Sequence, residues 1–130
     1  MKRCGFRDIG CRCGVVLGGL CVSLLAMSGC ARAPVTPVNQ DPVVDAGPDQ
    51  TVAAGSTVTL SGTATDADGD TVTFAWLQTS GTAVTLTGAD TATPTFAAPA
   101  TAGTLIFRLT GDDGHGGTAT DTVTITVTGP

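Results

Sequence analysis

Three aspartates within five residues are the part of this sequence best suited to chemistry. Asp66, Asp68 and Asp70 alternate along one turn, and Gly69 permits the tight backbone that such a turn needs. Oxygen ligands at alternating positions are the spacing that calcium sites use. Like charges this close together repel unless water or a cation screens them. The sequence therefore predicts a candidate calcium site with the ligands Asp66, Asp68, Asp70, Asp112 and Asp113.

A solvated acidic turn is the alternative, because Asp and Gly are also the usual residues of turns. An EF-hand is excluded, since no Glu follows and no helix flanks the turn. In an up-and-down run of strands, the loops 66–70, 88–91 and 111–117 would meet at one pole. We expect that pole to gather Asp45, Asp66, Asp68, Asp70, Asp90, Asp112 and Asp113. The fold itself requires no cofactor, and calcium is the one candidate ion.

Residues for catalysis are scarce. The sole histidine, His115, sits between glycines, and residues 31–130 contain no Cys, Lys, Glu or Tyr. Ser56, Ser61 and Ser80 do not lie in a nucleophile-elbow sequence. We therefore predict that the chain is not an enzyme.

Short apolar alternations separated by turn residues fill the chain from residue 43 onward. Val72, Phe74 and Trp76 point to one side of a strand over 71–78, and Trp76 is the predicted core anchor. Because the aromatic side chains after residue 30 fall on inward or mid-strand positions, none is expected to be left to stack on a sugar. This pattern predicts an all-β antiparallel sandwich of about seven strands. The strands are expected near 43–44 with 51–52, 57–61, 71–78, 84–86, 93–97, 104–110 and 121–128.

The first 29 residues are read as a signal peptide. Four of the six basic residues lie in the first twelve positions, and an apolar run of 13 residues follows over 15–27. That run is well short of the ~20 residues that a membrane-spanning helix needs. A basic start and a short apolar run are typical of a cleaved secretory signal, with a transmembrane helix as the weaker alternative.

The end of this signal, Met27-Ser28-Gly29-Cys30, resembles the lipobox of bacterial lipoproteins. The resemblance implies cleavage before Cys30 and a lipid on its thiol, although Met27 stands where Leu is usual. No Cys occurs after Cys30, which agrees with this role. An ordinary signal with an incidental Cys is the alternative. The expected location is the bacterial cell envelope, with the domain periplasmic or extracellular, and Ala31 favours the outer membrane if the host is Gram-negative.

Residues 30–42 read as a lipidated N-terminus and tether, because Pro34, Pro37 and Pro42 favour an extended chain. Residues 43–130 form the expected domain. Over residues 31–130 two arginines stand against ten aspartates, for a net charge of −8 with His115 neutral. A surface this acidic repels phosphate backbones, so a nucleic-acid partner is not expected.

The turn and strand motifs together resemble a PKD repeat, a sandwich of the immunoglobulin type. The resemblance covers about 42–128 and implies an immunoglobulin-like module that is extracellular and non-catalytic, used for adhesion, spacing or protein–protein contact. The expected partners are the membrane, through the lipid, and another envelope or extracellular protein; a calcium- or glycan-binding module is the alternative function. The motifs are Ala46-Gly47-Pro48-Asp49-Gln50-Thr51-Val52, Val58-Thr59-Leu60, Asp66-x-Asp68-Gly69-Asp70, Trp76-x-Gln78-x-x-Gly81, Phe107-Arg108-Leu109 and Asp113-Gly114.

Overall fold

The computed structural model describes residues 35–129. The signal peptide (1–29) and Cys30 lie outside this range. Within it, the compact unit begins at Thr36, so seven residues of the expected tether, 36–42, belong to the folded part of the chain. None of the described residues forms a helix that is long and apolar enough to span a membrane.

The described chain is all-β, as predicted, and its strands follow the alternation of threonine with apolar residues. Branched Cβ atoms favour pleated backbone, which explains why the Thr–Val runs become strands. There are eight strands between residues 35 and 129: β1 (Val43–Asp45), β2 (Gln50–Ala53), β3 (Thr57–Thr59), β4 (Thr63–Thr65), β5 (Thr73–Ser80), β6 (Thr95–Ala97), β7 (Gly103–Asp112) and β8 (Thr118–Thr128).

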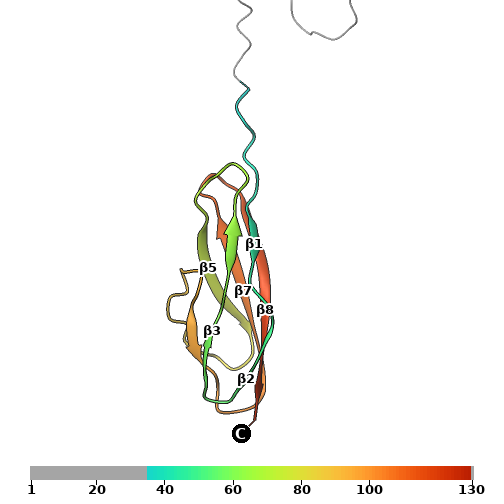
Figure 1. Cartoon of the computed structure of the whole chain (residues 1–130), viewed down its shortest axis with the longest axis vertical. Coiled ribbons are helices and arrows are strands. Elements are labelled where there is room, and N and C mark those ends of the chain that lie inside the picture. The colour runs from blue at the N-terminus through green and yellow to red at the C-terminus, as the bar shows by residue number, and fades with distance from the viewer. Residues whose placement is uncertain (1–34, 130) are drawn as a thin grey trace, which may run out of the picture. The chain divides into compact units, whose positions relative to one another are not determined.

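One four-stranded sheet and two short strand pairs build the sandwich (Figure 1). The sheet has the order β2-β8-β7-β5, and the pairs are β1-β4 and β3-β6. All pairings are antiparallel except β2 with β8, where Gln50 lies opposite Ile125 in a parallel register. The parallel strand is possible because residues 46–49 carry the chain from one layer to the other between β1 and β2. This arrangement is an immunoglobulin-like sandwich.

Three details differ from the sequence-based expectation. β4 was not predicted, and 84–86 is not a strand, although Val84 and Leu86 are half-buried and pack against the core. The strand expected near 43–44 with 51–52 is two strands, β1 and β2, which lie in different sheets. The side-chain amide of Gln78 explains the second difference. Its Nε2 donates to the carbonyls of Ser80 and Thr82, and its Oε1 accepts the N–H of Val84, so this segment is held by one side chain rather than by a ladder.

The core lies between the layers and is anchored by aromatic residues. Trp76 on β5 is 6% exposed, and its Nε1 donates to the carbonyl oxygen of Thr91 at 3.0 Å. The rings of Phe96 and Phe107 lie 4.8 Å apart between β6 and β7. The same buried cluster contains Leu60, Phe107 and Ile125, so both layers contribute to it.

Gly62 allows β3 and β4 to run close over this core. A Cβ atom built there would lie 2.7 Å from Trp76 and 2.7 Å from Leu109, closer than side chains tolerate. We predict that Gly62→Ala lowers the free energy of unfolding by about 1–3 kcal/mol, because it overpacks the core. Gly103→Ala is the matched control, since nothing lies within 4 Å of the added methyl. Urea unfolding midpoints measure both, and equal midpoints for the two variants would contradict this packing.

Candidate functional site

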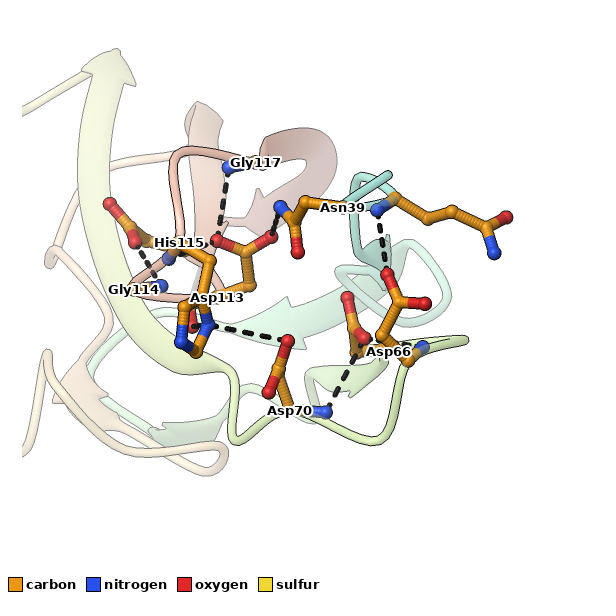
Figure 2. Close-up of polar contacts among 10 residues, drawn as sticks. Asn39, Asp66, Asp70, Asp113, Gly114, His115 and Gly117 are labelled. Carbon is orange, nitrogen blue, oxygen red and sulfur yellow. Dashed lines mark hydrogen bonds and ion pairs between the residues drawn. The ribbon is translucent and has the colours of Figure 1, made fainter. Parts of the chain in front are cut away.

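Strand register brings the two acidic turns together at one end of the sandwich. Thr73 pairs with Asp112 at the start of β5 and the end of β7, so the turn before β5 meets the turn after β7. We call the residues 66–70 and 112–117 the acidic pole (Figure 2). The link between its halves is His115, whose Nδ1 lies 3.2 Å from Oδ2 of Asp70. The predicted meeting of these two turns is therefore present in the structure.

Asp113 is the buried centre of the acidic pole, with only 3% of its surface exposed. Its Oδ1 accepts the backbone N–H groups of His115 at 2.7 Å and Gly117 at 3.0 Å. Its Oδ2 accepts the side-chain amide of Asn39 at 2.7 Å. Because a buried carboxylate is costly unless it is hydrogen-bonded, these three donors are what permit Asp113 to be buried.

The first turn is organised by Asp66. Its Oδ1 accepts the N–H of Asp68 at 2.7 Å and that of Asp70 at 3.4 Å, the local bonding that makes Asp a turn residue. Its Oδ2 is buried and has no hydrogen-bond partner among residues 35–129. Nδ1 of His115 lies near two acceptors, the Asp70 carboxylate and the carbonyl oxygen of Asp113 at 3.1 Å, so the tautomer with its proton on Nδ1 fits both contacts.

The last part of the expected tether, residues 36–41, is bound to the acidic pole, and we call these residues the tether end. Besides the bond from Asn39 to Asp113, the backbone N–H of Gln40 donates to Oδ2 of Asp68 at 2.7 Å. Gly117 makes room for this contact. A Cβ there would collide with the Asp113 carboxylate and lie 3.0 Å from Oδ1 of Asp41. An open pocket of about 490 Å³ remains beside the tether end, lined by Pro37, Asn39, Asp68, Asp70 and His115.

The expected aspartates do not all face one point. Asp112 is exposed and accepts the N–H of Gly114 at 2.7 Å, which closes its own turn. Asp45 caps the bend after β1 by accepting the N–H of Gly47. The loop that carries Asp90 lies beside the middle of β5, where the N–H of Trp76 donates to Ala89, so its expected place at the pole is wrong. Across residues 35–129 no three His, Cys, Asp or Glu side chains are arranged to hold a metal ion.

Hydrogen bonding controls the charge of Asp113. The Asn39 side-chain amide is the main cause that holds the pKa of Asp113 below its usual value of 3.8, and the N–H groups of His115 and Gly117 act in the same direction. Burial acts in the opposite direction but is outweighed. Asp113 is therefore a carboxylate at neutral pH, held in place by the tether end and by its own turn.

Sequence reasoning missed Asn39 and Gln40, because they lie in the segment that was assigned to the tether. The one available signal was compositional. Asn39, Gln40 and Asp41 form a polar group between two prolines, directly before the first strand. Such a group suits a turn contact as well as a linker, so the pattern alone does not distinguish the two.

Comparisons with known proteins agree with this fold. The family described as K319L-like, PKD domain, matches residues 46–127. Among solved structures, the chain is similar to the PKD domain from the KIAA 1837 protein, with 23% identity, a TM-score of 0.54, and coverage of 73% of this chain and 97% of that one. It is also similar to a nucleoside hydrolase-related hypothetical protein from Saccharophagus degradans, described as associated with carbohydrate metabolism, with 24% identity and a TM-score of 0.61. That similarity covers 69% of this chain and 26% of the other, and no curated protein matches.

The tether contact has a consequence for acid stability. The folded pKa of Asp113 lies below its unfolded value, so its contribution to stability is full above that value and is lost as the pH falls through the folded pKa. Asn39→Ala removes the main cause of the lowered pKa, and we predict that the midpoint of acid unfolding moves to higher pH. Circular dichroism between about pH 1 and 5, the range in which such carboxylates titrate, measures it.

Gln40→Ala is the matched control for Asn39→Ala. Gln40 reaches Asp68 through its backbone N–H, which alanine retains. Its acid midpoint should equal that of the wild type. If Asn39→Ala also unfolds at the wild-type pH, the tether end does not stabilise the Asp113 carboxylate.

Proposed function

The chain belongs to the K319L-like PKD domain family, and from this premise we propose that it is a lipid-anchored, non-catalytic interaction module of the bacterial cell envelope. Its role is to hold a rigid sandwich in a fixed direction at the end of a membrane tether, where it contacts another envelope or extracellular protein. The observation that carries this proposal is the binding of residues 36–41 to the acidic pole.

A bound tether end supports a positioning role for a physical reason. A flexible linker lets a domain sample many directions, and each fixed residue costs about 1–2 kcal/mol in backbone entropy. Two hydrogen bonds of 2.7 Å to carboxylates, one from Asn39 and one from Gln40, offset part of that cost. The direction in which the chain enters the sandwich is then set by the folded domain rather than by the linker.

A non-catalytic role is supported by the state of the few reactive groups. His115 is engaged by Asp70 and by the carbonyl oxygen of Asp113, and Asp113 is buried in hydrogen bonds. Trp76, Phe96 and Phe107 are buried in the core and Phe74 packs against it, which leaves little aromatic surface for a sugar. The description of the nucleoside hydrolase-related protein belongs to that protein, since this chain spans only 26% of it.

Lipid anchoring at Cys30 has its own test. We predict that the wild-type protein, expressed in a lipoprotein-processing host, incorporates a fatty-acid probe and fractionates with membranes, because several acyl chains give stable anchoring where one does not. Cys30→Ala should lose the probe and remain uncleaved. Cys21→Ala, within the predicted signal, is the control and should label like the wild type. Equal labelling of the Cys30 variant and the wild type would overturn the anchor.

Calcium binding at the acidic pole is the second candidate function. The observation that favours it is Oδ2 of Asp66, a buried carboxylate oxygen without a hydrogen-bond partner among the described residues. Such an oxygen is a suitable ligand for a hard cation, and Asp68 and Asp70 lie in the same turn. Asp112 and Asp113 would be the more distant members of this candidate set.

The melting temperature tests this candidate. If the acidic pole binds calcium, about 1 mM CaCl2 should raise the melting temperature by a few degrees over a chelator, because a ligand of the folded form alone stabilises it. Asp66→Asn should abolish the rise. Asp90→Asn, which lies beside β5 and away from the pole, should keep it. If the wild-type melting curves in calcium and in chelator are identical, the acidic pole does not bind calcium and residues 66–70 are a solvated turn.

A further inference from the structure

Arg108 is the only basic residue, histidine aside, among residues 35–129, which also contain ten aspartates. It lies on β7, an interior strand of the four-stranded sheet, and its side chain is on the solvent-facing side. The register places Leu77 of β5 and Thr122 of β8 directly beside it. Within the described part of the chain it forms no ion pair. The domain therefore displays one isolated positive charge in the middle of a sheet.

The direct strand neighbours of Arg108 are uncharged and partly apolar, and the closest carboxylate beyond β8 is that of Asp49, which accepts the N–H of Thr124. Leu77 is 55% exposed, one of only two large apolar side chains on the strands with that much exposure. Along β7 the neighbours on the same face are Ile106 and Thr110. The next acidic residue on this strand face is Asp112, four residues away, or about 13 Å at 3.3 Å per residue. We call Ala75, Leu77, Ile106, Arg108, Thr110 and Thr122 the Arg108 patch.

One arginine among aliphatic and uncharged polar side chains is the composition typical of the centre of a protein–protein interface. Interface cores are depleted of charged residues except Arg, and Arg is among the residues that contribute most to binding energy. The guanidinium presents a planar fork of N–H donors that fits a carboxylate through two parallel hydrogen bonds. Leu77 and Ile106 would exclude water from such a pair, which strengthens it.

We propose that the Arg108 patch is the docking surface for a second protein that presents an Asp or Glu carboxylate set among aliphatic side chains. This rests on the proposed function as an interaction module and names the surface and the chemistry of the partner. Charge complementarity selects the occupant. Apart from Arg108, residues 35–129 carry ten aspartates and no Lys or Arg, a charge of −10 with His115 neutral, so the guanidinium is the group in this range to which a single carboxylate of the partner can bind.

Other occupants fit the charges less well. In a symmetric pair of sheets packed face to face, the two Arg108 side chains would approach each other across the two-fold axis, and two domains of charge −9 would repel. An anionic lipid surface or a nucleic acid would be attracted by one arginine but repelled by the ten aspartates of residues 35–129. An arginine that merely keeps the sheet soluble is the remaining alternative, and the experiment must separate it from a docking role.

The experiment uses the full chain in the envelope of its own cells. A photoreactive amino acid replaces Leu77, and a matched protein carries it at Val43, which is 69% exposed on the other layer. We expect one protein adduct from position 77 that is missing from position 43. The partner peptide in the adduct should contain an Asp or Glu. Arg108→Ala should lower the adduct yield about tenfold or more, the loss expected for a charged hydrogen-bonded pair.

Two further variants separate docking from solubility. Arg108→Lys keeps the positive charge and the solubility but lacks the planar fork, so it should also lower the yield. Arg108→Glu should abolish the adduct, and replacing the partner's acidic residue by Arg should restore it. The proposal is overturned if Arg108→Ala and Arg108→Lys give the wild-type yield, if the adduct is a second copy of this chain or a lipid, or if no adduct forms. Membrane fractionation of the same cells reports the proposed anchoring separately.

Discussion

The buried carboxylate of Asp113 is the constraint on which the acidic pole depends. A carboxylate with 3% exposure needs donors, and the chain supplies them from two places that are 74 residues apart in sequence. Two donors are backbone N–H groups of its own turn, and the third is the amide of Asn39. Gly117 has to be a glycine, because a side chain there would occupy the place of that carboxylate. One charge thus fixes the turn after β7 and the entry of the chain.

The residue types in the domain also determine where its charges lie. The sequence has no Glu and a single Lys near the N-terminus, and the domain carries most of its acids at turns and strand ends. There Asp45, Asp66, Asp112 and Asp113 bond to local N–H groups. The interior strand β7 carries one Arg among uncharged neighbours on its outer face. The result is a domain with an acidic end that binds residues 36–41 and a sheet face with one arginine at its centre.

The strands were largely readable from sequence, whereas the tether contact was not. Val123, Ile125 and Val127 alternate with threonines and are all buried, because the period of a strand fixes which side chains enter the core. The segment 84–86 alternates equally well but is held by the amide of Gln78, a contact that no local pattern reveals. Pairing Asn39 with Asp113 requires knowledge of the three-dimensional fold. The meeting of the two acidic turns was predictable, since the topology determines it.

The rigidity of residues 36–41 tests the central claim most directly. Backbone order parameters from 15N relaxation compare this segment with the strands in the same protein. If the tether end is bound to the acidic pole, Asn39 and Gln40 should have order parameters near 0.85, like rigid backbone, and the values should fall in Asn39→Ala. Order parameters below about 0.6 in the wild type are typical of a flexible chain and would contradict the account. Residues 36–41 would then be part of a free tether.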